Sequence, residues 1–456
     1  MLRVAAPPPP AWDALLPPEV RRLPDELARI DAYLDDERFI TPWRALFAAR
    51  LGRPSVPVQT LLRLLYLKHR YQLGYRTLCR EVADSISWRR FCHIPLDQPV
   101  PHPTTLVKLV GRAGPKTIEQ LNHALLAKLA GERVLRCRKL RIDTTVVEAD
   151  IDHPTDADLL EHAVRTLGGL VRRVHARGAA TRTLFRDRSR AAGRRLKQIS
   201  RTLRRRTGQA PAEIDRLTAQ VAQIARRTLA QAERVARNAR RALGRRPGDG
   251  RLERLVARLE ETTTQTHRLL DQTRQRLCGN RVIGDRLISL ADPDARPIRK
   301  GKPHKPTEFG YTVLLAEDER GFVADHQLSK GNPADAPQLL PAVHRVAALR
   351  GRPPATVVAD RGFGFAANDR ALAELGVRRI GLQRTGTPSR TRRELEQTRA
   401  FKRMRNWRVG IEARISHLKR SFGLRRTRLR RLAGAQTWVG LGIFAYNLQR
   451  MTVVTR

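Results

Sequence analysis

Predominantly apolar runs of strand length recur in the last third of the chain, separated by segments with helical periodicity. The strand-like runs are residues 308–317, 321–328, 356–359 and 377–382. The first two flank the polar triplet Asp318-Glu319-Arg320 and therefore predict an antiparallel hairpin. Helices are predicted between the later runs, at residues 338–349 and 368–375. A further strand-like run, Lys139-Leu-Arg-Ile-Asp143-Thr-Thr-Val-Val147, lies far upstream of the others.

The order of these elements narrows the fold class. It runs strand, long interruption, hairpin, helix, strand, helix, strand and final helix. This order is expected of an α/β ribonuclease-H-like core that is interrupted after its first strand. The polar residues 386–405 are predicted to form a loop or a mobile helix. The most hydrophobic stretch, residues 434–446, is too short to span a bilayer and predicts a buried helix.

The N-terminal part of the chain has a different pattern. Residues 1–41 are Pro-rich and are predicted to be irregular. Residues 42–130 have helical periodicity, with Pro57 near a helix start and a Thr cap at Thr104. Short helices that carry basic side chains are typical of a helix-turn-helix-like DNA-binding domain. The alternative is a helical bundle that only packs on the α/β core.

The long interruption after the first strand, residues 156–304, is rich in basic helical segments. Between Val171 and Thr207 there are 14 Arg plus Lys and a single acid, Asp187. Apolar residues at 3-4 spacing predict a pair or trio of long helices with a coiled-coil seam, and a loop is predicted at 244–250. The insertion is interpreted as a clamp on a DNA backbone, contacted by Arg194, Arg195 and Lys197. A dimerisation arm or a solvated charged face are the alternatives.

Net charge restricts the class of partner. The 456 residues include 89 Lys plus Arg and 44 Asp plus Glu, a formal net charge of +45. Such an excess favours a polyanionic partner, with nucleic acid as the leading candidate. The alternative explanation for the many arginines is the composition of a GC-rich genome. Such a bias can exchange Lys for Arg, but it does not create a net charge of this size. The four cysteines form no CxxC pair or disulfide framework, and no signal peptide is predicted. We therefore expect a protein of the reducing cytoplasm.

Three acidic residues are the candidate site of chemistry: Asp143, Asp360 and Glu412. Asp143 lies in the upstream strand, and Asp360 directly follows the apolar run 356–359. Glu412 lies in a segment with helical periodicity. In a strongly basic chain, an acidic cluster is best explained by two divalent cations held against a phosphodiester. Other carboxylates, Glu148, Asp150, Asp152 and 317–319, are weaker candidates because loop carboxylates are usually solvated.

The helix around Glu412 has two stripes at helical spacing. The apolar stripe consists of Trp407, Ile411, Ile415, Leu418 and Phe422. The polar stripe consists of Arg408, Glu412, Ser416 and Lys419. If the apolar stripe packs on the sheet, the polar stripe faces the strand ends that carry Asp143 and Asp360. Glu412 then completes a metal site, or it is merely the ion-pair partner of Arg408 one turn earlier.

These motifs resemble those of bacterial insertion-sequence transposases of the DDE class. Asp143 in Ile-Asp-Thr-Thr-Val-Val matches the first Asp motif, and Asp360 in Val-Val-Ala-Asp-Arg-Gly-Phe matches the second. Arg408, Glu412 and Lys419 match the signature Tyr-x2-Arg-x3-Glu-x6-Lys. The Tyr position of that signature is Arg405 here, which is a departure from the family pattern.

The resemblance implies metal-dependent cleavage of DNA at the ends of a mobile element, followed by strand transfer into target DNA. It implies two Mg²⁺ ions, replaceable by Mn²⁺, held by Asp143, Asp360 and Glu412. It also implies a double-stranded DNA partner, comprising terminal inverted repeats and target DNA, and a homodimer that processes two ends together. It implies a prokaryotic, cytoplasmic, nucleoid-associated protein without a membrane partner. The predicted DNA contacts near the acids are Arg408, Lys419, Arg405 and Arg361.

The sequence therefore predicts four domains. They are an irregular N-terminus at 1–41, a terminal-repeat-binding domain at 42–130, a catalytic domain at 131–155 and 305–456, and a basic helical insertion at 156–304. A DNA-binding protein with decayed catalysis, and a non-transposing nuclease of the same fold, are the alternative functions.

Overall fold

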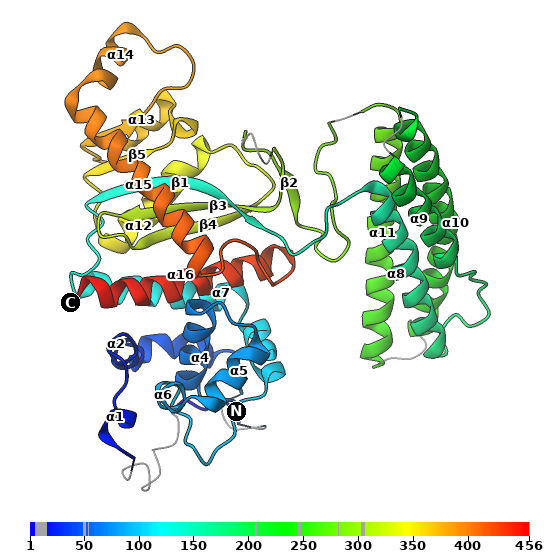
Figure 1. The fold of residues 1–456 in the computed structure, drawn as a ribbon, viewed down its shortest axis with the longest axis horizontal. Coiled ribbons are helices and arrows are strands. Elements are labelled where there is room, and N and C mark those ends of the chain that lie inside the picture. The colour runs from blue at the N-terminus through cyan, green and yellow to red at the C-terminus, as the bar shows by residue number, and fades with distance from the viewer. Residues whose placement is uncertain are drawn as a thin grey trace. The chain divides into compact units, whose positions relative to one another are not determined.

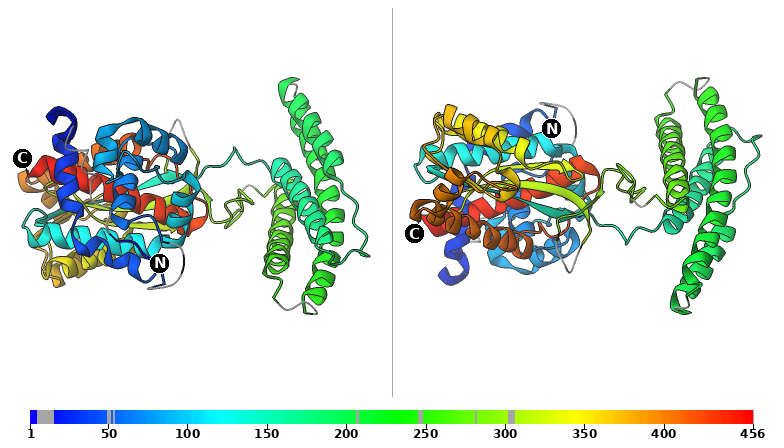
Figure 2. Two further views of the ribbon diagram at one scale, coloured as in Figure 1. Left: turned by 90° about the horizontal axis from the view of Figure 1, so that it is seen from below. Right: turned by 90° about the horizontal axis from the view of Figure 1, so that it is seen from above.

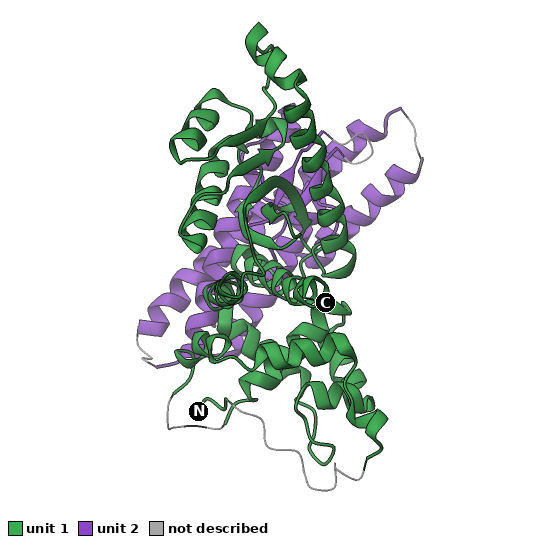
Figure 3. Ribbon diagram, turned by 90° about the vertical axis from the view of Figure 1, so that its left-hand side faces the viewer, with its two compact units in different colours: residues 1–150, 310–456 green, residues 151–309 purple. Residues whose placement is uncertain are grey.

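The computed structural model describes residues 1–4, 16–48, 52, 54–205, 208–244, 248–280, 282–301 and 306–455. The chain divides into two compact units (Figure 3). Unit 1 comprises Met1–Asp150 and Gly310–Arg456, and unit 2 comprises Ile151–Phe309. Each unit is described by itself below.

A mixed β-sheet forms the centre of unit 1 (Figure 1). Its strands are β1 (Lys139–Glu148), β3 (Glu308–Asp318), β4 (Val323–Lys330), β5 (Thr356–Ala359) and β6 (Arg379–Leu382). Their spatial order is β4-β3-β1-β5-β6. The hairpin β3–β4 and the pair β1–β3 are antiparallel, whereas β1, β5 and β6 are parallel. The predicted strand runs, including the hairpin, are therefore confirmed.

Helices cover both faces of this sheet. Those of the C-terminal half are α12 (Ala336–Arg350), η3 (Arg361–Phe363), α13 (Ala366–Glu374), α14 (Arg390–Gln397), α15 (Arg399–Ser421) and α16 (Arg431–Val454). Successive side chains of a strand point to opposite faces. Odd-numbered residues of β1 face α15, because Arg141 donates a hydrogen bond to the Trp407 carbonyl. Even-numbered residues face the start of α12, because the Thr144 hydroxyl donates to Asp335. Residues 386–405, predicted as loop or helix, are largely helical.

The N-terminal helices belong to the same compact unit as the sheet, and several of them pack on α16. They are α1 (Pro18–Arg21), α2 (Asp25–Leu34), η2 (Glu37–Phe39), α3 (Thr41–Arg44), α4 (Val58–Arg70), α5 (Tyr75–Asp84), α6 (Ile86–Phe91) and α7 (Pro103–Gly131). Helix α7 is kinked at Gly114, whose φ is +63°, and Pro115 follows. The predicted buried helix at 434–446 is confirmed as the centre of α16, and Asn122 of α7 donates a hydrogen bond to its Gly440 carbonyl.

The prediction that residues 1–41 are irregular was wrong for most of the described part. Helix α2 buries Leu27, Ile30 and Leu34, which follow one another at 3-4 spacing on one helical face. The Pro-rich composition hid this short stripe, and prolines in fact precede the helices because they are tolerated at helix starts. The run Pro7-Pro8-Pro9-Pro10 lies outside the described residues.

Unit 2 contains four long helices that lie side by side, followed by the short strand β2 (Arg296–Ile298) (Figure 2). The helices are α8 (Asp156–Ala176), α9 (Ser189–Arg205), α10 (Ala210–Gly244) and α11 (Gly250–Leu277). Their common core consists mainly of Leu, Val and Ala, and it includes Val221 of α10 with Leu252 and Leu259 of α11. A pair or trio of helices was predicted, and the described residues of unit 2 form four long helices. The helix that was not predicted separately is α8, whose buried apolar residues begin shortly after the end of β1.

Candidate active site

The strand register brings the first two acids together. β1 and β5 are parallel, and their last paired residues are Ile142 and Ala359. Asp143 and Asp360 are the next residues on the two strands. At Asp360 the chain leaves the sheet and turns into η3, so that both carboxylates lie where the parallel pairing ends. The sequence identified both residues, and the register explains why they meet.

The third acid reaches the same place from α15. The guanidinium of Arg408 lies 3.6 Å from an Asp143 carboxylate oxygen and 3.8 Å from an Asp360 oxygen. It also donates a hydrogen bond of 3.1 Å to Glu412, one helical turn further on. Carboxylates from three distant segments of the chain are thus gathered around one cation. The polar stripe predicted on this helix explains how Arg408 and Glu412 reach the strand ends together.

The three carboxylates differ in exposure. The Asp143 side chain is 16% exposed, whereas those of Asp360 and Glu412 are 53% and 60% exposed. Asp143 also accepts a hydrogen bond of 2.7 Å from the Thr144 amide. One carboxylate is therefore held in place within the fold, and two are open to a ligand arriving from solvent.

The donor set matches the preference of Mg²⁺ or Mn²⁺ for carboxylate oxygens. Among the described residues, however, no three Asp, Glu, His or Cys side chains are close enough to hold an ion directly. The position between the three acids is taken by the Arg408 guanidinium. The carboxylates thus fit a divalent cation in kind, but in this arrangement, with the Arg408 guanidinium between them, they are not close enough together to hold one ion.

A buried ion network fixes α15 on the sheet. Glu317 of β3 is 1% exposed and accepts hydrogen bonds from Arg141 of β1 and Arg414 of α15, at 2.8 and 2.9 Å. The Arg141 guanidinium then reaches the Trp407 carbonyl at 2.9 Å. It fits there because α15 has a glycine at this point: a Cβ on Gly410 would lie 2.2 Å from an Arg141 nitrogen. Glu317 was predicted to be a solvated carboxylate, which is wrong.

Asp335 was missed by the sequence analysis. It precedes α12 and does not cap the helix with its side chain. Instead it accepts a hydrogen bond of 3.0 Å from Thr144, the neighbour of Asp143. Its other carboxylate oxygen lies against Gly362, where a Cβ would come within 2.9 Å. Asp335 therefore contacts the two segments that carry Asp143 and Asp360. An Asp before Ala-Pro at a helix start resembles an ordinary cap, so the sequence held no signal for this role.

The other candidate residues are distributed as follows. Arg361 and Arg405 are exposed, and Lys419 is half-buried on α15. In unit 2, Arg194 and Lys197 are exposed on α9, and Arg195 donates a hydrogen bond to Gln198. Asp318 accepts hydrogen bonds from the Arg320 and Phe322 amides, as expected for a turn residue, but it is buried, and burial raises its pKa to about 6.

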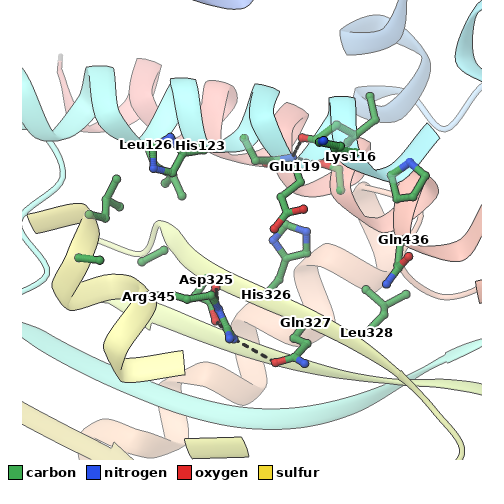
Figure 4. Close-up of a pocket in the computed structure, with 17 residues that line it drawn as sticks. Lys116, Glu119, His123, Leu126, Asp325, His326, Gln327, Leu328, Arg345 and Gln436 are labelled. Carbon is green, nitrogen blue, oxygen red and sulfur yellow. Dashed lines mark hydrogen bonds and ion pairs between the residues drawn. The ribbon is translucent and has the colours of Figure 1, made fainter. Parts of the chain in front are cut away.

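A cavity of about 880 Å³ lies elsewhere in unit 1, between α7, β4, α12 and α16 (Figure 4). Glu119 and His326 point toward one another in it, and Arg345 pairs with Asp325 at 2.7 Å. Burial lowers the pKa of His326. None of the three candidate acids lines this cavity.

Comparison with known proteins identifies two segments of the chain that match transposase domains. A model described as "Transposase domain (DUF772)" matches residues 14–112, and one described as "Transposase DDE domain" matches residues 262–448. The second match includes Asp360 and Glu412, and Asp143 lies between the two matched segments. An uncharacterized protein, ORF8 in the nfe locus of Rhizobium meliloti, is 25% identical over 161 residues, which cover 30% of this chain and 75% of that protein. No solved structure matches the chain.

The two family matches support the resemblance found in the motifs, because two segments of the chain match transposase domains, one of them a DDE domain. They do not test the Tyr-x2-Arg-x3-Glu-x6-Lys signature. Such a domain implies a ribonuclease-H-like fold, with which the mixed sheet and its flanking helices agree. It also implies that DNA is bound. Among the described residues, no helix has the length and apolarity needed to cross a membrane.

The buried network at Glu317 predicts a stability difference. Glu317→Gln leaves Arg141 and Arg414 without their carboxylate, and breaking a buried ion pair in this way costs about 3–5 kcal/mol. Glu394→Gln is the control, because its pair with Arg390 is exposed and contributes at most about 1 kcal/mol. All five tryptophans lie in unit 1, so the denaturation midpoint followed by tryptophan fluorescence reports this unit alone. Equal midpoints for the two variants would exclude the network as the anchor of α15.

Proposed function

We propose that this chain catalyses metal-dependent cleavage of DNA at the ends of an insertion element and transfer of the freed 3′ end into target DNA. Asp143, Asp360 and Glu412 are the proposed metal ligands. The observation that supports this is the convergence of three carboxylates, from segments far apart in sequence, around the single guanidinium of Arg408. A structural ion pair needs one acid, whereas a site for divalent cations needs several.

A divalent cation at these carboxylates would activate water and stabilise the negative charge that develops on the phosphate oxygens. The chain's own residues prepare the site for it. Asp143 is held by the Thr144 amide and keeps its orientation. Asp360 and Glu412 are exposed and can move to meet the ligand.

Arg408 has a distinct role in this proposal. Without DNA, its guanidinium balances part of the negative charge of the cluster. When a phosphodiester arrives, the same guanidinium can turn from the carboxylates to the phosphate, to which Arg forms strong paired hydrogen bonds. The residue thus holds the acids together in the free protein and the DNA in the complex. Arg361, Arg405 and Lys419 are the further proposed phosphate contacts around it.

The remaining parts of the chain receive roles consistent with this reaction. We assign recognition of the terminal repeats to helices within residues 42–130, and catalysis to 131–155 with 305–456. The insertion, residues 156–304, is assigned to the DNA backbone through Arg194, Arg195 and Lys197. A homodimer is proposed because two ends must be processed together.

The first prediction from this proposed function concerns the three acids. Asp143→Ala, Asp360→Ala and Glu412→Gln should each retain DNA binding and lose Mg²⁺-dependent nicking of a fragment that carries the gene's own flanking sequence. Glu394→Gln, an exposed acid of α14 outside the cluster, should nick normally. Nicking by any of the three variants would remove that residue from the site. Specific binding without nicking by the wild-type protein would favour a DNA-binding protein with decayed catalysis.

The second prediction concerns Asp335, proposed to position the acids through Thr144 and Gly362. Asp335→Ala should raise the Mg²⁺ concentration needed for nicking, or lower activity, by about 10–100-fold, as is usual when a partner of a metal ligand is removed. Asp335→Asn keeps the acceptor for Thr144 and should recover most of this activity. If the Asn variant is as impaired as the Ala variant, the charge of Asp335 is required and a purely positioning role is wrong.

The third prediction concerns the insertion. The triple variant Arg194→Ala, Arg195→Ala, Lys197→Ala should reduce the slope of log K against log salt by about 0.9 for each DNA phosphate that these side chains neutralise in the wild type. The control is an equal change at Arg216, Arg258 and Arg274, which are already paired with acids of unit 2. An unchanged slope for the first triple variant would point to a role of the insertion in assembly.

A further inference from the structure

The first half of α7, residues 103–113, has two faces of opposite character. It is set off from the second half by the kink at Gly114. One face is buried in unit 1 and consists of Leu106, Leu109, Val110 and Ala113. The opposite face is exposed, and its members recur at helical spacing. They are Thr104, Val107, Lys108, Gly111 and Arg112, which together are called the exposed face of α7 below.

The exposed face of α7 carries positive charge without nearby acids in the sequence. No Asp or Glu occurs between Asp97 and Glu119. Among the described residues, neither Lys108 nor Arg112 forms an ion pair with a carboxylate, and the Arg112 guanidinium lies over the Phe47 ring, 5.1 Å from its centre. Exposed cations that the protein does not balance itself favour a polyanionic partner.

Two uncharged residues of this face point to a partner that approaches closely. Val107 is an apolar side chain that is 48% exposed. Gly111 lies inside the helix, where glycine is less favourable than alanine. A Cβ on Gly111 would meet nothing within 4 Å, so the fold itself does not require a glycine there. A partner that lies against the helix backbone at Gly111 and covers Val107 explains both residues.

None of the other described helices between residues 42 and 130 presents such a face. Helix α4 is buried along almost its whole length. On α5, Arg80 pairs with Glu81, and the exposed side ends in Asp84. The two arginines of α6, Arg89 and Arg90, donate hydrogen bonds to backbone carbonyls of the same unit. The first half of α7 is therefore the helix of this region best suited to contact DNA.

The exposed face of α7 matches the chemistry of the major groove of DNA. That groove is about 12 Å wide and admits an α-helix. In helix-turn-helix proteins, residues near the start of the recognition helix contact the base edges. Here Lys108 can donate to the O6 and N7 atoms of guanine, and Val107 can contact the methyl group of thymine. Arg112, further along the helix, can reach a backbone phosphate.

We propose that the exposed face of α7 enters the major groove of duplex DNA and that Val107 and Lys108 contact base edges there. The inference rests on the proposed function and deepens it, because it assigns recognition of the terminal repeats to one helix face. Beyond the kink, Asn122 of the same helix donates a hydrogen bond to the Gly440 carbonyl of α16. One half of α7 thus contacts DNA, and the other half fixes that contact to the catalytic region.

The first test compares Lys108→Ala with the wild type. The full chain is titrated, in EDTA and at one salt concentration, with a duplex that carries the gene's flanking sequence and with a shuffled duplex of equal length. Lys108→Ala should reduce the preference for the flanking sequence by about 5–150-fold, the usual value of one good base contact. In a set of duplexes with single base-pair changes, it should lose discrimination at one position. Arg76→Ala, which removes an exposed charge of α5, is the control and should keep the preference.

The second test adds a side chain where the proposed complex has no room. Gly111→Gln has space in the free protein, because a Cβ there meets nothing within 4 Å. In the complex the same side chain would lie between the helix and the DNA, so the preference for the flanking sequence should be lost. The denaturation midpoint followed by tryptophan fluorescence should not fall, because Gln is a better helix former than Gly. Gly131→Gln, at the other end of α7 and equally unobstructed, is the matched control and should bind as the wild type does.

The outcomes separate this inference from the function on which it rests. If the wild type prefers the flanking sequence and both Lys108→Ala and Gly111→Gln keep that preference, another surface reads the DNA and the inference is wrong. Equal weakening of both duplexes by Lys108→Ala would make Lys108 a phosphate contact and would also overturn it. A wild-type protein that binds the two duplexes equally would instead contradict the recognition of terminal repeats in the proposed function itself.

Discussion

The placement of α15 on the sheet is the constraint on which the candidate site depends. The buried Glu317 of β3 forms ion pairs with Arg141 from the sheet and with Arg414 from α15. The glycine at position 410 lets the Arg141 guanidinium pass beneath the helix. A shift of α15 by one turn would carry Glu412 about 5.4 Å away from the strand ends. A charged network far from solvent therefore sets the geometry of acids that lie at the surface.

The sign of the charge at the candidate site is opposite to that of the chain as a whole. The chain as a whole is strongly basic, and this excess favours DNA. The candidate site inverts the pattern, with three acids around one arginine. In a basic protein such a cluster does not repel DNA at long range, but it can accept cations at the point of contact. The paired arrangement with Arg408 keeps the cluster compact until a phosphate competes for the guanidinium.

The sequence was sufficient to predict that the three acids lie near one another, because each lies in a short pattern with a physical meaning. Asp143 and Asp360 lie in or directly after apolar strands, and Glu412 lies beside an apolar helical stripe. Glu317 and Asp335 were not recognised in the same way. Each depends on a partner far away in the chain, as Glu317 does on Arg141 and Arg414, and periodicity carries no information about such pairs. The helix of Leu27, Ile30 and Leu34 was missed because its stripe is short and begins among prolines.

The discontinuity of unit 1 has a consequence for the way in which the protein is made. β1 leaves the ribosome before the whole of unit 2, yet both of its sheet neighbours, β3 and β5, come after that unit. The N-terminal helices remain uncovered longer still, because α16, the helix that packs on several of them, is synthesised after all strands of the sheet. Unit 2, whose helices share a hydrophobic core of their own, can fold during this delay and bring the ends of β1 and β3 together, which lowers the entropic cost of closing so long a loop. A chain cut short before α16 would leave the apolar faces of α4 and α7 uncovered, so that incomplete copies are candidates for aggregation and degradation rather than for partial activity.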